Sequence, residues 1–342
     1  MATTKEIKNR IKSVKDTQKI TNAMYLISST KMTRAKKDLE NTRPYFDMLR
    51  KQISTMIMMS EDVKSGYFKD ASSYIQQDNL KAIKSAVMGE FTNPNPEESE
   101  VPRLINEGEK SVSEETMGYL VITADKGLAG AYNQNVIKEA MRLIEDDNKY
   151  KLFVVGEYGR HYFEGRGIEI EESFLYTAQN PTLERAREIT QVLTDRYSSG
   201  EIDKIYIIYT DFKNGLMGGD VNSTVILPFD RDDFLNDEDA LPQTGFVPEY
   251  YPDVETVLDN IIPSYIMGYI YSALVDSFCS EQSARMSAMD AANQNAEDLL
   301  GRLNLEYNHV RQGAITQEIT EVSAGSRGQK KSKKKRKARE EG

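Results

Sequence analysis

The apolar residues at the start of the chain recur at helical spacing. Gaps of three and four residues separate them within two groups, Ile7, Ile11 and Val14, then Ile20, Met24 and Ile27. The segment from Thr3 to about Met58 has no glycine, and Pro44 is its one helix breaker, where we expect a kink or a local boundary. A helix of this length would reach about 80 Å at 1.5 Å per residue. That exceeds an ordinary globular helix and indicates a coiled coil.

A second long helical pattern occupies the end of the chain, from Asp253 to about Val322. Its expected apolar face contains Val257, Ile261, Tyr265 and Tyr269, then Ala284, Ala288, Ala291 and Asn295, then Leu299, Leu303, Val310 and Ala314. These residues would span about 100 Å of helix. A lone helix cannot bury its apolar stripe, so we expect the two terminal helices to pair as an antiparallel coiled coil.

Between the two helices the pattern changes to short apolar runs separated by amphipathic segments. Strands are predicted at "GYLVITAD", "KLFVVG", "IEIEESFLY", "DKIYIIYTDF" and "NSTVILPF", and helices at "QNVIKEAMRLIEDD" and "PTLERAREITQVLTDRY". This alternation predicts a mostly parallel sheet with helices packed on it. The fold class is therefore α/β, a Rossmann-like domain combined with a long antiparallel coiled coil of the N- and C-terminal helices.

Charge is unevenly distributed along the 342 residues. The net charge is −10, but residues 327–339 carry nine Lys and Arg and no acid, which leaves 35 basic and 52 acidic residues in 1–326. An acidic body argues against a general nucleic-acid binder. The basic tail could touch nucleic acid, anionic lipid or an acidic protein surface, or it could simply keep the chain in solution.

Few residues are available for metal or redox chemistry. The chain has one cysteine, Cys279, and two histidines that are distant in sequence, His161 and His309. An intramolecular disulfide is impossible and a zinc site is not expected. The N-terminus lacks the apolar core of a signal peptide, and the least polar run, residues 260–275, is shorter than the ~20 residues of a spanning helix.

The segment "VITADKGLAGAYNQN" has the strand, glycine turn and helix order of a dinucleotide site. Gly127 and Gly130 give only G-x-x-G, which is incomplete, and glycines at such turns usually serve backbone geometry. No catalytic constellation of known spacing is found, so we expect no catalytic residue and no cofactor.

The expected packing face of the C-terminal helix carries small side chains in its middle part. Alanine at Ala284, Ala288 and Ala291, with Asn295, lets helices approach closely but gives up apolar burial. The neighbouring positions form an expected polar face, Arg285, Asp290, Asn293, Gln294 and Asn295. Both features suit a narrow rod that moves against its surroundings.

Several of these segments resemble the gamma subunit of F-type ATP synthases. "IKSVKDTQKITNAMYLISSTKM" is similar to the first helix of that family, and "SEQSARMSAMDAANQNAEDLL" with "YNHVRQGAITQEITEVSAG" is similar to its last helix. "ITADKGLAGAYN" resembles the first strand and turn of the central domain. The similarity covers residues 1–58 and 117–325 in the same order.

The resemblance implies a non-catalytic rotor subunit of a proton-translocating ATP synthase. Its paired helices would form a shaft inside a ring of three alpha and three beta subunits, on the cytoplasmic face of the membrane. Its α/β domain would rest on the ring of c subunits beside the epsilon subunit, with no nucleic-acid partner. Turning the asymmetric shaft would drive the three nucleotide sites through different affinities.

The resemblance also assigns partner contacts with the beta subunit. Met24 matches a shaft position that faces an acidic segment of beta, which Lys19 and Lys31 would attract. The alternative for these two lysines is that they are solvated helix lysines. The matches to the contacts with a second beta loop are Arg311, Gln312, Thr316 and Glu318.

Five segments follow from the pattern and the resemblance together. They are an N-terminal shaft helix (1–59), a mobile insert (60–116) with short helices near 78–88, an α/β domain (117–252), a C-terminal shaft helix (253–324) and a disordered basic tail (325–342). Residues 60–116 and the tail both depart from the family pattern. The alternatives are a Rossmann-type nucleotide-binding enzyme with coiled-coil arms, and a nucleic-acid-binding coiled coil that rests on the tail alone.

Overall fold

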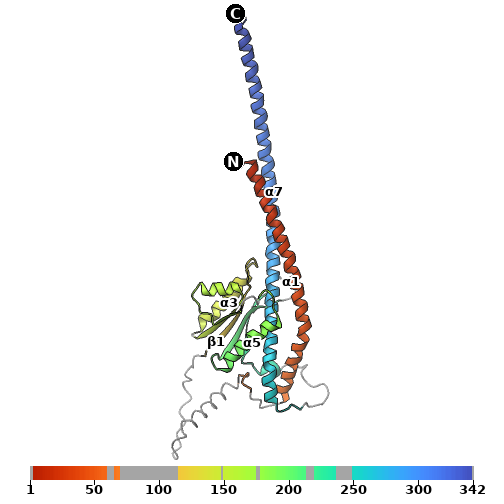
Figure 1. Cartoon of the computed structure of the whole chain (residues 1–342), viewed down its shortest axis with the longest axis vertical. Helices are drawn as coiled ribbons and strands as arrows, with labels where there is room; N and C mark the ends of the chain where they lie inside the picture. Colours follow the sequence, from red (N-terminus) through yellow and green to blue (C-terminus); the bar gives the residue numbers. More distant parts are fainter. Residues whose placement is uncertain are drawn as a thin grey trace, which may run out of the picture. The chain divides into compact units, whose positions relative to one another are not determined.

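The structure, a computed structural model, describes residues 3–59, 65–69, 115–147, 149–174, 178–212, 219–235 and 249–340 (Figure 1). The chain divides into two compact units, Met1–Ser28 with Met286–Gly342, and Ser29–Arg285. The second unit contains the sheet together with the adjoining parts of both long helices. The division therefore falls within both predicted shaft helices. The parts of these helices that belong to Ser29–Arg285 share a hydrophobic core with the α/β domain.

Helix α1 (Thr4–Met59) is a single helix that continues through Pro44. Its first turn is closed by a reciprocal cap, in which the Glu6 N–H donates to Thr3 Oγ1 at 3.3 Å and the Thr3 N–H donates to Glu6 Oε2 at 2.8 Å. Its less exposed positions alternate in steps of four and three over 7, 11, 14, 18, 21, 25 and 28. This is a heptad seam, so the coiled-coil prediction is confirmed for α1. Ile20 and Ile27, which we expected on the packing face, are 61% and 55% exposed.

Helix α7 (Val254–Glu340) is capped by Asp253, whose Oδ1 accepts the Thr256 N–H at 2.8 Å. It continues through Pro263 and then through residues 325–340, where the sequence predicted a disordered tail. The tail has no proline and is rich in Lys and Arg, which favour helix. Extending an existing helix also requires no new nucleus, so the backbone stays helical.

The sheet contains β1 (Met117–Ile122), β2 (Tyr150–Val155), β3 (Glu172–Phe174), β4 (Lys204–Thr210) and β5 (Val221–Leu227). Their order is β3-β2-β1-β4-β5, and every pair is parallel except β4 with β5. All five strands were predicted from the sequence. The antiparallel β5 follows from its short connection to β4, since a parallel neighbour would need a crossover.

Helices cover both faces of the sheet (Figure 1). Tyr119 and Val121 of β1 pack with α3 (Tyr132–Asp146) and with α4 (Glu157–Glu164). Leu120 and Ile122, which alternate with them, pack in the core that contains α5 (Leu183–Ser198), α1 and α7. The short helices α4 and α6 (Asp232–Leu235) were not predicted. Burial on both faces explains why β1 reads as a continuous apolar run.

Within this unit α1 and α7 pack closely and antiparallel. The ring of Phe46 lies 6.5 Å from that of Tyr271, and Cys279 lies opposite Met32. At Gly268 an added Cβ would meet the Phe46 ring at 2.1 Å. Gly268 is therefore required for close approach of the two helices.

Part of the predicted mobile insert is packed. Residues 65–69 follow α1, and Phe68 is 2% exposed among Phe229 and Phe234. The Phe229 N–H donates to Tyr67 O at 2.7 Å, and Ser65 Oγ donates to Asp259 Oδ1 at 2.8 Å. The mobile prediction is wrong for these five residues, because aromatic burial fixes them. The rest of 60–114, including the region near 78–88 where short helices were predicted, lies outside the described residues.

Among the described residues no helix has a stretch both long and apolar enough to span a bilayer.

Candidate functional site

The end of the sheet where Rossmann-like folds bind ligands is the first candidate site. Ligands in such folds occupy the crevice beyond the carboxyl ends of the strands, where the strand order reverses. In the order β3-β2-β1-β4-β5 that point lies between β1 and β4. The turn after β1 contains the incomplete glycine motif, Gly127 and Gly130.

Side chains of α7 occupy this crevice. Arg285, which is 8% exposed, donates from Nη2 to the carbonyl oxygens of Gly127 at 3.1 Å and Lys126 at 3.5 Å. Its Nη1 lies 2.5 Å from Oε1 of Glu281, which is 6% exposed. We call these two residues the α7 clamp. Burial raises the pKa of Glu281, and the positive charge of Arg285 opposes that shift.

The end of β4 is held by the same helix. The Thr210 N–H donates to Ser277 Oγ at 3.3 Å, and Ser280 Oγ donates to the Thr210 carbonyl at 3.4 Å. Ala284 packs on a small cluster of Ala124, Ala129 and Tyr132. The crevice thus binds this chain's own helix through buried polar contacts. The nucleotide-enzyme alternative gains no support, because α7 engages the turn that would hold phosphate.

The glycine turn itself has a special backbone. Gly130 has φ of 56°, and Leu128 has φ of 65° although it is not glycine. Gly130 therefore serves the backbone geometry of the turn, as interpreted from the sequence. Gly127 has no positive φ, so that interpretation is not supported for it. Leu128 is 66% exposed, so its left-handed conformation is maintained by the turn around it.

The second candidate site is the helix pair of the other unit. Thr21 Oγ1 donates to Asn293 Oδ1, Asn293 Nδ2 donates to Asn22 Oδ1 at 2.6 Å, and Gln18 Nε2 donates to Glu297 Oε1 at 3.3 Å. Residue numbers rise on α1 while they fall on α7, so the helices are antiparallel, as predicted. Figure 1 shows the first turns of α1 beside α7. The contacts between the two helices at these residues are therefore polar.

The face of α7 that packs differs from the predicted one. Met289 and Leu303 are 5% and 4% exposed, whereas Ala291 and Asn295 are exposed. Ala284 and Ala288 are half-buried. Leu303 was predicted on the packing face and is buried as expected. Between residues 284 and 295, the larger Met289 buries more apolar area than the alanines could, so the packing stripe there is displaced by about one residue. The expected polar face is wrong for Arg285 and Asn293, which take part in the buried clamp and the seam.

The predicted partner-contact residues lie on exposed or half-exposed helix surface. Met24 is half-buried, and Arg311, Gln312, Thr316 and Glu318 are exposed. The Thr316 hydroxyl donates to the Gln312 carbonyl at 2.9 Å. An apolar stripe beside them was missed in the sequence, namely Ile315, Ile319 and Val322, which are 45%, 64% and 74% exposed. Its i, i+4, i+7 spacing was the available signal.

The comparisons with known proteins identify the family. A family model described as ATP synthase matches residues 3–328. The ATP synthase gamma chain of Caldanaerobacter subterraneus subsp. tengcongensis is 36% identical over 329 residues, covering 94% of this chain and 98% of that protein. The chain belongs to the ATP synthase gamma chain family. Residues 329–342 of this gamma chain lie beyond the family match.

Other similarities agree with this assignment. The ATP synthase gamma chain of Ruminiclostridium cellulolyticum is 36% identical over 327 residues and covers 94% of this gamma chain. Among solved structures, the central stalk and c-ring of the Tetrahymena thermophila mitochondrial ATP synthase matches with a TM-score of 0.51 and 24% identity. That match covers 80% of this chain and 99% of the other. It establishes a similar fold.

Proposed function

We propose that this gamma chain is the central-stalk rotor subunit of an F-type ATP synthase. It couples ion-driven rotation of a membrane ring to conformational changes at the catalytic sites of an alpha and beta ring. The chain itself carries no catalytic residue in this proposal. Its α1 and α7 helices form the shaft.

The observation that carries the proposal is the exposed apolar stripe Ile315, Ile319 and Val322 near the end of α7. On an isolated helix such a stripe would face water, so a partner must cover it. Ile20 and Ile27 form a comparable exposed pair on α1. A shaft enclosed by a ring of other subunits provides that cover at both places.

The mechanism requires only that the shaft presents different surfaces in different directions. In a nearly threefold ring, each beta subunit then meets a different set of side chains at any one angle. A contact that favours one conformation of beta shifts its equilibrium by the difference in binding free energy between the conformations. Turning the shaft moves that bias from one beta subunit to the next.

The partners in this proposal are three alpha and three beta subunits, the epsilon subunit and the c-subunit ring, with no nucleic acid. The complex lies on the cytoplasmic face of the cell membrane, where this chain is peripheral. Met24 contacts an acidic segment of beta, with Lys19 and Lys31 contributing positive charge. A second beta loop is contacted by the polar residues beside the apolar stripe, Arg311, Gln312, Thr316 and Glu318.

Replacing Ile319 with aspartate tests the proposal in the assembled complex. The carboxylate would have to lose its hydration inside the ring, which costs several kcal/mol without a partner. We expect ATP-driven ion pumping by reconstituted complexes to fall about tenfold or more. The helix content of the isolated chain should not change, since Ile319 is exposed there.

The matched control is Gln317→Asp, which adds the same charge on the opposite side of the helix and should retain more activity. Pumping at the unmodified rate by Ile319→Asp would contradict an enclosed shaft. The proposal also requires that the chain co-purify with alpha and beta subunits as one copy per hexamer.

A further inference from the structure

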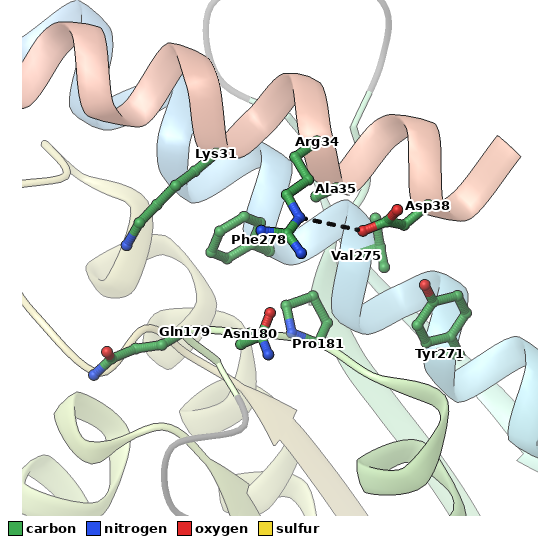
Figure 2. A pocket seen from close by; sticks show the side chains of 10 residues that line it. All are labelled: Lys31, Arg34, Ala35, Asp38, Gln179, Asn180, Pro181, Tyr271, Val275 and Phe278. Carbon is green, nitrogen blue, oxygen red and sulfur yellow. Dashed lines mark ion pairs between the residues drawn. The ribbon is translucent and has the colours of Figure 1, made fainter. Parts of the chain in front are cut away.

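A small cleft lies within the larger unit, where α1, α7 and the segment before α5 meet (Figure 2). Its volume is about 140 Å³. Ala35, Val275 and Phe278, all buried, line its interior, and Pro181 lines it from the α/β domain. The walls therefore come from three separate parts of the chain.

The mouth of the cleft is polar and mainly positive. Lys31 and Arg34 reach from α1 toward Gln179 and Asn180 (Figure 2). Asp38 is the one carboxylate of the lining, and its Oδ2 lies 4.0 Å from Arg34 Nε. Both side chains of that pair are more than half exposed, and such pairs contribute little, so the guanidinium can take a better acceptor. Phe278 of α7 lines the same cleft as this guanidinium.

We propose that this cleft binds a small organic anion with a single-ring apolar body, the ring lying over Phe278 and Pro181 and the anionic group between Lys31 and Arg34. The anion would also meet the amide groups of Gln179 and Asn180. The site is separate from the shaft contacts of the proposed function, and it does not depend on them.

Size and charge together select this class of ligand. A cavity of ~150 Å³ holds one benzene molecule, so the cleft matches one six-membered ring. A carboxylate accepts two parallel hydrogen bonds from a guanidinium, and an ammonium group adds a second positive charge. A neutral ring of the same size would fill the cleft but would form no ion pair with Lys31 or Arg34. Binding would link α1 to the segment before α5 and stabilise the folded chain.

Benzoate is the probe for the full chain, and benzamide is its neutral counterpart. We expect benzoate to bind with a Kd on the order of 1 mM, as suits a ligand of this size, and benzamide to bind more weakly. The double variant Lys31→Gln with Arg34→Gln should weaken benzoate binding about tenfold. The control, Arg10→Gln with Lys15→Gln, removes the same charge from exposed positions of the same helix and should leave the affinity unchanged.

A crystal of the full chain soaked in 4-bromobenzoate provides a readout that does not depend on any variant. The bromine should be found in this cleft, on the side of the ring that faces away from Lys31 and Arg34. Equal affinities of benzoate for the unmodified chain and for the double variant would overturn the proposal, and so would bromine located elsewhere.

Repeating the titration with the assembled complex shows whether the cleft is open to a free ligand there. Benzoate binding in both forms supports the site and assigns it to a free molecule. Binding to the isolated chain and exclusion from the complex supports the site and shows that another subunit covers it in the complex. Absence of binding to the isolated full chain would refute the site in either case.

Discussion

Asp276, a half-buried carboxylate of α7, makes the stability of the larger unit depend on pH. Burial, together with the nearby charge of Asp211, raises the pKa of Asp276 to about 7, against the opposing positive charge of Arg43 of α1. Lys36 of α1 and Cys279 of α7 belong to the same surroundings. A carboxylate whose pKa is higher in the folded state than in the unfolded state favours folding at low pH, and this contribution is lost as pH rises through the folded pKa.

We therefore predict that the free energy of unfolding falls between pH 5 and pH 8 by about 2 kcal/mol more in the unmodified chain than in Asp276→Asn. Urea unfolding of both proteins at the two pH values measures the difference. Asn has nearly the same shape as Asp and no titrating proton. The pH dependence that comes from all other groups is therefore the same in both proteins and cancels in the difference. Parallel pH dependence of the two proteins would show that Asp276 does not keep its proton in the folded state.

At the scale of the elements, the α7 clamp connects the helix to the turn after β1. Arg285 and Glu281 are both buried, so neither charge can be removed without leaving the other unpaired. We predict that Arg285→Met lowers the free energy of unfolding by about 3–5 kcal/mol. The double variant Arg285→Met with Glu281→Leu should recover much of that loss, because no buried charge remains.

Thermal or urea unfolding of the two single variants and the double variant gives the coupling energy of the pair. Additive effects would mean that the two side chains do not form a buried ion pair. Arg302→Met provides a control, since Arg302 is exposed on the same helix and its replacement should change stability by less than about 0.5 kcal/mol.

At the scale of the whole molecule, most of the basic tail lies beyond the family match. The match ends at residue 328, and α7 continues to Glu340. We predict that deleting residues 327–342 leaves ATP hydrolysis by the assembled complex within about twofold of the full-length rate, because nearly all of this segment lies beyond the residues that match the family. A complex inactive after the deletion, with normal subunit content, would show that the tail takes part in coupling.

Local patterns in the sequence were sufficient for most of the elements. The periodicity of 3.6 over long stretches predicted α1 and α7, and short β-branched runs predicted all five strands. The alternation of these runs with helices predicted the parallel sheet. Each of these features depends on neighbours within a few residues, which is why they can be read without a structure. The helices α4 and α6 were missed because they are too short to show a period.

The partner-contact residues came from the family resemblance, and they remain predictions. The apolar stripe at Ile315, Ile319 and Val322 could have been found from spacing alone. The clamp could not, because Arg285 and Gly127 are 158 residues apart and nothing local marks an arginine for burial. The same holds for Phe68, which lies in a mostly polar stretch of the sequence and is fixed by Phe229 and Phe234.

The sequence by itself determined that two long helices flank an α/β domain and that the chain belongs with the gamma subunits. Only the tertiary structure decided which side of α7 faces α1, why Gly268 lies under Phe46, and that the ligand crevice is filled by the chain's own helix. The physical reason is that a helix with several weakly apolar sides has no preferred face alone. Its partner selects the face that buries the most apolar area and satisfies the buried polar groups.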